Sequence, residues 1–461
     1  TMSVYQAAAV LKDIKNLDPG IQTALGGPHV SFCARESLAA FPFVDFIVRG
    51  EGEEAVIELA RAVEKGGGFE NVAGLVFREN GSVREAPERP PGLDVNTLPR
   101  PARHLLPMGR YRTLGLAVSM TTSRGCPHQC IFCVGRRMVG ARVRYRDPVP
   151  VVDELEYLGA QGFPQVNLAD DLFTANRRHC LAVCDEILRR GLKVKWTSFA
   201  RVDTVTPEVL GRMKAAGCCA VSFGVESGVP EILETIRKGI TLDQVVAAVG
   251  MCTDAGIIPH ASFILGLPGE SPDTLRRTIE FGEKLNGLGV SYGYHLLAPF
   301  PGTRVRDQAA EYGLRILTDD WSQYHANRAI VETPTVTAAM LDEVAIKWEQ
   351  AFDEYLGRLK ERRDAGLAGE EEAWPLTNLE RLVVNYDLML GRVLEEKGHW
   401  PLDGGASGVE AALKKLAGRA AEALGKSAPE VLDALTHAYG KGGLKYTEND
   451  GRAAFAWVEG L

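Results

Sequence analysis

Three cysteines lie close together in the segment SRGCPHQCIFC, residues 123–133, at Cys126, Cys130 and Cys133. Thiolates bind zinc and iron–sulfur clusters. A closed structural zinc site takes four ligands, usually as two separated pairs, whereas this segment has three thiols and the chain has no second pair at zinc-finger spacing. Three thiolates on a four-iron cluster would leave one iron open to a substrate or cofactor. Two alternative interpretations are three unrelated core cysteines and a zinc site completed by His128.

The composition describes an ordinary globular protein of two or three domains, with 461 residues, 45% hydrophobic and 24% charged. The net charge of -8 gives no support to nucleic-acid binding. The sequence has no run of 18 apolar residues and no secretion leader, so we expect a cytoplasmic protein without a transmembrane segment. Nine cysteines are an odd number and argue against a disulfide framework.

The arrangement of apolar segments predicts an α/β chain. Residues 2–65 alternate helix and strand, as in a parallel sheet with helices on both faces, and Asn80-Gly81 predicts a tight hairpin. The chain opens on a helix rather than a strand, so we expect that residues precede Thr1 in the natural protein. From about residue 116, six apolar strands separated by five helical stretches predict a partial (β/α)6 barrel. We therefore expect an α/β domain at 1–90, a proline-rich linker at 91–114, a barrel at 115–310 and a helical region at 311–461.

The cysteine motif is the strongest sign of relationship. C-x3-C-x2-C directly after the first barrel strand, with Phe132 before the last cysteine, resembles the signature of the radical S-adenosylmethionine (radical SAM) superfamily. The resemblance implies an oxygen-sensitive enzyme in which Cys126, Cys130 and Cys133 hold a [4Fe–4S] cluster. The fourth iron of that cluster is chelated by S-adenosylmethionine (SAM). An electron from the cluster then cleaves SAM and releases a 5'-deoxyadenosyl radical.

Other strand ends supply the residues that this resemblance assigns to SAM. They are Phe132, Asp170, Asp171, Arg201, Glu226 and Gly266, the last in FILGLPGE, where Glu270 falls one residue later than the strict family pattern. The alternatives are structural: Asp170 or Asp171 caps a helix, and Arg201 forms an ion pair. A carboxylate such as Glu226, after an apolar strand, is costly to bury without a partner.

The segment before the barrel resembles the cobalamin-binding domain of one branch of this superfamily, in its second half. That branch includes carbon methyltransferases and the anaerobic magnesium-protoporphyrin ester cyclase. The resemblance rests on ALGGPHVSF, on VRGEGEEAVIELA and on the proline-rich linker. It implies that cobalamin lies near Gly26, Gly27, His29, Gly50 and Gly52, because glycines let the backbone approach a bulky ligand. Ordinary turn glycines are the alternative.

These resemblances predict a cobalamin-dependent radical SAM enzyme that methylates a weakly activated carbon of a small or medium-sized substrate, through a 5'-deoxyadenosyl radical and methylcobalamin. A non-methylating oxidation or cyclisation with the same cofactors is the first alternative, and a non-catalytic protein with a structural zinc or cluster site is the second. The predicted partners are the substrate and an electron donor such as a flavodoxin or ferredoxin. Either substrate binding or packing explains a further set of polar and aromatic residues: Tyr292, Tyr294, His295, His325, Asn327 and Arg328.

Overall fold

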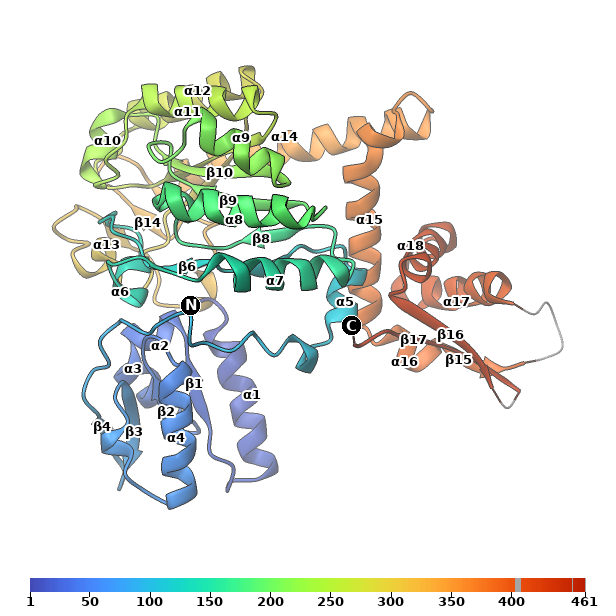
Figure 1. The fold of residues 1–461 in the computed structure, drawn as a ribbon, viewed down its shortest axis with the longest axis horizontal. Helices are drawn as coiled ribbons and strands as arrows, with labels where there is room; N and C mark the ends of the chain where they lie inside the picture. Colours follow the sequence, from blue (N-terminus) through green and yellow to red (C-terminus); the bar gives the residue numbers. More distant parts are fainter. Residues whose placement is uncertain (403–407, 450, 461) are drawn as a thin grey trace.

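The computed structural model describes residues 1–402, 408–449 and 451–460. Its N-terminal part is a four-stranded sheet in the order β1-β2-β3-β4, with helices packed against it (Figure 1). The elements here are α1 Val4–Leu17, β1 Ala24–Gly26, α2 Pro28–Phe32, α3 Ala34–Ala40, β2 Phe46–Val48, α4 Glu53–Lys65, η1 Phe69–Asn71, β3 Leu75–Glu79 and β4 Ser82–Glu85.

Only part of this sheet is parallel. β1 and β2 pair in parallel, as predicted, but β3 runs antiparallel to β2 and β4 antiparallel to β3. The turn between β3 and β4 is the predicted Asn-Gly hairpin. Asn80 has φ 51° and Gly81 has φ 78°, which are the left-handed conformations that a tight hairpin turn requires.

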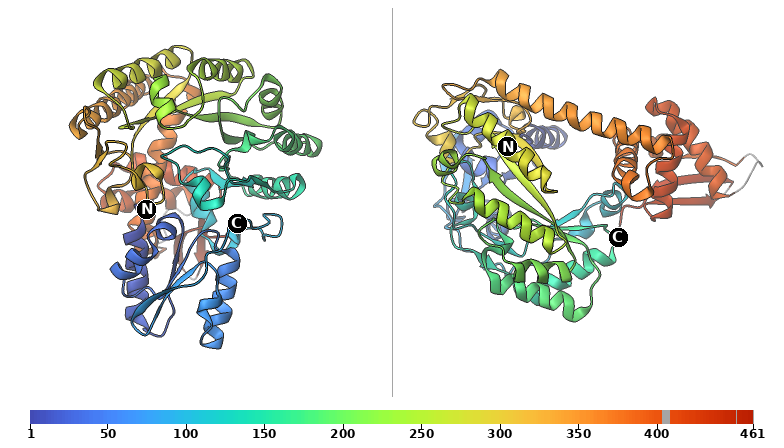
Figure 2. Two further views of the ribbon diagram at one scale, coloured as in Figure 1. Left: turned by 90° about the vertical axis from the view of Figure 1, so that its left-hand side faces the viewer. Right: turned by 90° about the horizontal axis from the view of Figure 1, so that it is seen from above.

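The second part is a six-stranded sheet with the order β12-β11-β10-β9-β8-β5, and every neighbouring pair in it is parallel. Its strands are β5 Val118–Met120, β8 Val166–Leu168, β9 Trp196–Ala200, β10 Cys218–Glu226, β11 Ile258–Leu265 and β12 Ser291–Leu296. Their number and order along the chain match the six strands predicted from about residue 116. The sheet curves into a crescent with its helices on the outer side (Figure 2), which is the predicted partial barrel.

Five longer helices alternate with these strands: α7 Pro148–Ala160, α8 Arg177–Arg190, α9 Pro207–Ala215, α11 Leu242–Asp254 and α12 Pro272–Gly287. Several begin with side-chain caps, for example Thr206 on α9 and Ser271 on α12, each followed by proline. Short elements complete the loops: β6 Ser123–Arg124, α6 Gly135–Val139, β7 Arg144–Tyr145, η3 Phe173–Ala175, α10 Pro230–Thr235, α13 Arg304–Asp307, β13 Arg315–Ile316, η4 Trp321–Gln323 and β14 Val331–Glu332.

The C-terminal region is helical as predicted, but it also holds a small sheet that the sequence did not reveal. Its helices are α14 Ala338–Asp364, α15 Glu370–Leu390, α16 Val393–Lys397, α17 Val409–Leu424 and α18 Ala428–Gly440. β15 His399–Pro401, β16 Leu444–Asn449 and β17 Arg452–Trp457 form an antiparallel sheet in the order β15-β17-β16. The prediction of a helical region at 311–461 is therefore incomplete, because it did not include this sheet.

The linker crosses from the first sheet to the barrel through η2 Arg103–Leu105 and α5 Met108–Thr113. Arg103 Nη1 donates to Glu154 Oε1 of α7 at 2.6 Å, and Arg103 Nη2 to Ser119 O of β5 at 3.1 Å. These contacts fix the linker against the first barrel strand. Within the described residues, no helix is long and apolar enough to cross a membrane.

Candidate active site

The cysteine loop begins where β5 ends and is framed by the β6–β7 hairpin. Gly125 has φ 111°, and a Cβ there would lie 2.5 Å from Arg142 O, so only glycine fits. Its N–H donates to Asp171 Oδ2 at 3.0 Å, and Cys126 N–H donates to Gly140 O at 3.2 Å. The loop is therefore held by its own backbone and by the end of β8.

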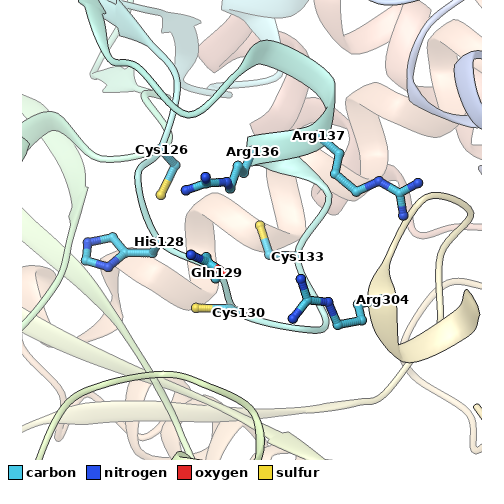
Figure 3. Close-up of a pocket in the computed structure, with 8 residues that line it drawn as sticks. All are labelled: Cys126, His128, Gln129, Cys130, Cys133, Arg136, Arg137 and Arg304. Atoms are coloured by element: carbon cyan, nitrogen blue, oxygen red, sulfur yellow. The ribbon is translucent and has the colours of Figure 1, made fainter. Parts of the chain in front are cut away.

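The three thiols point into the same space (Figure 3). They line one cavity of about 120 Å³ together with His128, Gln129, Arg136, Arg137 and Arg304. Burial raises the pKa of each of the three thiols, while the nearby charges of Arg201 and Lys238 lower the pKa of Cys126 and Cys130. A cluster held by three thiolates would find compensating positive charge here, so the donor set fits the predicted group.

The alternative interpretations of these cysteines do not fit the geometry. Cys133 is exposed and the other two are only half-buried, which is not the burial of core cysteines. In the part of the chain that the structure describes, no three His, Cys, Asp or Glu side chains are placed to hold one metal ion, so the thiols and His128 do not form a ready-made zinc site.

The predicted aspartates differ in their surroundings. Asp170 is buried and accepts hydrogen bonds from Thr122 N, Thr122 Oγ1 and Ser123 Oγ, each at 2.6 Å. Both of its oxygens therefore tie β8 to the end of β5. Asp171 is exposed beside the cysteine loop, where a Cβ on Gly135 would lie 3.1 Å from its Oδ1 and 3.5 Å from Cys133 Sγ.

Arg201 is buried at the end of β9 near the cysteine loop, and its guanidinium group is already paired with a carboxylate. Nε and Nη2 donate to the two carboxylate oxygens of Asp203 at 3.0 and 2.9 Å. This pairing lowers the pKa of Asp203 against the opposing effect of burial, which is the larger single influence. The ion pair is the structural alternative considered for Arg201, and Asp203 was not foreseen.

Glu226 also has a partner that the sequence analysis missed. Its Oε1 accepts from Lys238 Nζ at 2.6 Å, and both side chains are 8% exposed. Lys238 Nζ lies 6.0 Å from the ring centroid of Phe132, within cation–π range. Glu226 has φ 71° at a bulge in β10, which re-aims the strand end. A lysine within an apolar stretch, as in ETIRKGITL, is the signal that could have identified Lys238.

Gly266 ends β11 with φ 88°, and a Cβ there would lie 3.1 Å from Leu341 Cδ1 and 3.2 Å from Val331 Cγ2. Its N–H donates to Glu270 Oε2 at 2.7 Å. Glu270 is 1% exposed, and burial raises its pKa to about 8. The motif therefore builds a tight turn under the C-terminal region.

The five residues predicted to contact cobalamin fall into two groups. Gly50 and Gly52 line a cavity of about 820 Å³ between α4, the linker and the cysteine loop, and Gly50 lines a second one of about 450 Å³. Gly27 and Gly50 have φ 98° and 72°, and no atom lies within 4 Å of a Cβ built on either. Ser31 joins their loops, since Gly50 N–H donates to Ser31 Oγ and Ser31 Oγ donates to Gly27 O. These open glycine loops fit a bulky group.

Gly26 and His29 lie in less open surroundings. A Cβ on Gly26 would lie 3.6 Å from Val48 O, in ordinary contact. His29 is 7% exposed, and its ring packs edge-on against Trp321 with centroids 4.8 Å apart. Burial lowers the pKa of His29 to about 4. The structure therefore brings His29 to η4 rather than to either large cavity.

The residues considered for substrate binding do not form one cluster. A Cβ on Gly282 of α12 would lie 2.7 Å from Tyr294 Oη and 3.1 Å from Tyr292 Cδ2, so both tyrosines pack outward against α12. His295 is exposed on β12. The segment around Ala326 lies beside the end of β12, because Leu296 N–H donates to Ala326 O at 2.8 Å. This segment carries the other three candidate residues, His325, Asn327 and Arg328.

Ion pairs join the N-terminal sheet to the start of the cysteine loop, and the sequence analysis did not identify them. Glu51 pairs with Arg124 at 3.1 Å and with Arg144 at 2.8 Å, and its side chain is 6% exposed. Arg124 also pairs with Glu53 at 2.6 Å. Because Arg124 is two residues before Cys126, this cluster links the loop after β2 directly to the thiols.

The six remaining cysteines are free thiols, as expected for core residues: Cys33, Cys180, Cys184, Cys218, Cys219 and Cys252. Four of them are buried in the barrel core. Cys180 and Cys184 contact each other one turn apart on α8 and belong to no group placed to hold a metal among the described residues.

Comparison with known protein families gives two matches along the chain. The sequence model of the radical SAM superfamily matches residues 120–282, and that of the B12 binding domain matches residues 1–60. An uncharacterized methyltransferase of Pyrococcus horikoshii is 35% identical over 350 residues, which cover 75% of each chain. The anaerobic magnesium-protoporphyrin IX monomethyl ester cyclase of Rubrivivax gelatinosus is 30% identical over 418 residues, covering 87% of this chain and 72% of the cyclase.

A solved structure has the same fold over nearly the whole chain. The cobalamin-dependent S-adenosylmethionine radical enzyme OxsB, with aqua-cobalamin and S-adenosylmethionine bound, superposes with a TM-score of 0.64, at 18% identity over 94% of this chain and 68% of that one. The chain belongs to the cobalamin-dependent radical SAM methyltransferase family. It is an enzyme whose cofactors are a [4Fe–4S] cluster, SAM and cobalamin.

Proposed function

We propose that this enzyme transfers a methyl group from SAM to a weakly activated carbon of its substrate. The observation that carries the proposal is the position of the cysteine loop. Three thiols face a cation-lined cavity, and the same loop is tied through Arg124 to an N-terminal domain with open glycine loops. One site thus adjoins both cofactor-binding parts of the chain.

In this proposal Cys126, Cys130 and Cys133 hold the cluster, which with bound SAM supplies the radical that removes a substrate hydrogen atom. Asp171 accepts from the methionine amino group, because it is the exposed carboxylate beside the loop. Asp170 fixes the ends of β5 and β8 beneath it. Phe132 and Gly266 shape the walls of the SAM site.

Arg201 and Glu226 act in this proposal as paired groups. The Arg201–Asp203 and Glu226–Lys238 pairs keep opposite charges together in a half-enclosed site. Each pair leaves hydrogen-bonding capacity, because a guanidinium has five donor N–H groups and a carboxylate accepts more than one bond. We propose that the polar groups of SAM bind to the remaining donors of Arg201 and the remaining acceptor sites of Glu226.

Cobalamin, which carries the methyl group, is assigned to the loops of Gly26, Gly27, Gly50 and Gly52. His29 closes the interface with η4 and is not assigned to cobalt, because its ring is buried against Trp321. The division of the chain at residues 90, 114 and 310 belongs to the same proposal. So do a cytoplasmic location and an electron donor such as a flavodoxin or ferredoxin.

Oxidation or ring closure is the second candidate reaction. It is favoured by the 30% identity to a magnesium-protoporphyrin ester cyclase over most of the chain. Both reactions use the same cofactors and the same site. They differ in whether the methyl group of SAM is consumed.

Anaerobic reconstitution tests the cofactor assignment. We expect about four irons and four sulfides per chain and a bound cobalamin with its visible spectrum. Cys133→Ala should lose most iron, whereas Cys252→Ala, in the buried core, should keep it and cost only about 1–2 kcal/mol of stability. Equal iron loss from both variants would refute the cluster assignment.

The glycine loops have a matched control. Gly50→Leu should lower cobalamin occupancy while leaving the cluster in place, because a side chain there would enter the interdomain cavity. Gly191→Leu, also at positive φ with open surroundings but at the end of α8, should not. A full-length protein that takes up iron and sulfide but never cobalamin would overturn the proposal.

A further inference from the structure

The inner face of the partial barrel is not filled by its own side chains. Residues that face the helices alternate with residues that face inward, and on β9 the inward residue is Phe199, which is 52% exposed between buried Ser198 and Ala200. Phe199 is in register with Ser222, and Ser222 with His260. Ile258, two residues before His260, is 60% exposed on the same face.

The next rows of this inner face are small and uncharged. Gly224 of β10 is in register with Ser262 of β11, and Ser262 with Gly293 of β12. A closed barrel fills the same positions with bulky branched residues. Here the row leaves the interior open between Phe199 and the Glu226–Lys238 pair, which lies over Gly224, because a Cβ there would lie 2.9 Å from Lys238 Nζ.

Helix α14 crosses the open side of this crescent (Figure 2). Its Trp348 reaches the inner face, because a Cβ on Gly293 would lie 4.0 Å from Trp348 Cζ2. Gly293 faces inward, since its neighbours Tyr292 and Tyr294 pack outward on α12. Trp348 therefore marks the side of α14 that faces the barrel.

Two more aromatic rings lie on the same side of α14 as Trp348. Phe352 stacks on Trp348 with centroids 6.1 Å apart and planes at 3°, and Tyr355 follows at 6.5 Å from Phe352. The spacing of four and three residues keeps them on one helical face. Phe352 is 47% and Tyr355 51% exposed, so this aromatic row, Trp348, Phe352 and Tyr355, has solvent where a core helix would have a packing partner.

We infer that the aromatic row and the inner face around Phe199 bind the apolar body of the substrate, and that the substrate is an elongated, largely uncharged molecule. Between Phe199 and the row, the described inner face presents serine, glycine and the imidazole of His260, which lies beside Trp348 at Gly293, so a charged body would lose its hydration without compensation. Seven residues of helix from Trp348 to Tyr355 span about 10 Å. The substrate therefore has an apolar portion of about that length beyond its reacting carbon.

The surface is continuous with the site of the chemistry. Arg201 lies two residues beyond Phe199, and the carboxylate of Glu226 lies over Gly224 despite the bulge between them, because a Cβ on Gly224 would meet Glu226 Oε1. A molecule lying along the row would thus extend from the strand ends, where the cluster and SAM are assigned, down the inside of the barrel. This inference rests on the proposed function, because it takes the strand ends as the reacting end.

A neutral rod-shaped fluorophore, diphenylhexatriene, tests the inference on the reconstituted holoenzyme. We expect saturable fluorescence enhancement, and Phe352→Gln and Tyr355→Gln should each weaken probe binding by about tenfold, because each removes an aromatic ring that the bound probe would cover. Glutamine keeps a good helix propensity, so the helix should persist. Ile346→Gln is the matched control: Ile346 is 42% exposed on the same helix, about 200° around from Trp348.

Two further readouts separate the possible failures. Release of 5'-deoxyadenosine without substrate reports the radical machinery, so its absence in the wild type would refute the proposed function and not the binding surface. Unchanged probe binding in both aromatic variants would overturn the inference. It would also be overturned by sedimentation that shows a wild-type dimer and monomeric variants, because the row would then be covered by a second copy of the chain.

Discussion

Glu226 and Lys238 form a buried ion pair at the mouth of the barrel, and each depends on the other. Removing one partner of a buried pair leaves an uncompensated charge and typically costs about 3–5 kcal/mol. Replacing both by neutral groups of similar shape costs much less. We therefore expect Lys238→Met to destabilise the protein more than the double variant Glu226→Gln/Lys238→Met. Denaturant unfolding of the wild type, the single variants Glu226→Gln and Lys238→Met, and the double variant measures this coupling, and additive effects would mean that the pair is broken in solution.

Glu270 predicts a pH dependence of stability. Burial raises its pKa from 4.5 to about 8 in the folded chain, so between those values the folded state keeps a proton that the unfolded state has lost. Stability must then fall as pH rises through this window, by at most about 1.4 kcal/mol per pH unit. Glu270→Gln should remove that fall. Urea unfolding of both proteins between these pH values tests it, and parallel curves would contradict the assignment.

The role of a residue was predictable where it belongs to a local sequence motif. It was not predictable where it depends on a hydrogen-bond or ion-pair partner from another part of the chain. The three thiols were identified from their spacing alone, and in the structure they line one cavity. The partners of Asp170, Arg201 and Glu226 were not foreseen. Thr122 and Lys238 reach them only through strand order and a bulge, which a single sequence does not encode locally.

At the scale of elements, α2 packs closely against the loop after β12. Gly302 has φ 81°, and a Cβ there would lie 2.4 Å from Phe32 Cγ. Gly302→Ala should therefore displace Phe32 and loosen α2. Gly289 has the same φ with open surroundings, so Gly289→Ala suffers the same backbone strain without the clash.

We expect Gly302→Ala to lower the midpoint of thermal unfolding further than Gly289→Ala, because overpacking a tight contact typically costs about 1–3 kcal/mol. Limited proteolysis should also cut the N-terminal domain of the Gly302 variant faster. Equal behaviour of the two variants would show that Phe32 moves aside freely.

Elements were predictable where apolar runs were long and bounded by turns. The six barrel strands follow from such runs, and the hairpin follows from Asn80-Gly81. The sheet β15-β17-β16 was missed because its strands are rich in alanine and charged residues and lack a clear alternating pattern. β15 pairs with β17 across about 50 residues, so this part of the sheet depends on contacts that are not local, whereas β16 and β17 are neighbours along the chain.

At the scale of the whole molecule, the two cofactor-binding parts meet at the ion cluster of Glu51, Glu53, Arg124 and Arg144. Its members come from the loop after β2 and from the β6–β7 hairpin that frames the thiols. The two parts are thus joined next to the reacting site, and the large interdomain cavity lies against the same cluster. Under the proposed assignment the two cofactor sites lie side by side, as transfer of a methyl group between them requires.

The central claim is methyl transfer, and the products of SAM measure it most directly. Methylation consumes SAM in two ways, giving S-adenosylhomocysteine when the methyl group is donated and 5'-deoxyadenosine when the radical is formed. We predict that the reduced, anaerobically reconstituted enzyme releases both, and that S-adenosylhomocysteine disappears when cobalamin is omitted. Release of 5'-deoxyadenosine alone, with cobalamin bound, would contradict methyl transfer and favour oxidation or ring closure.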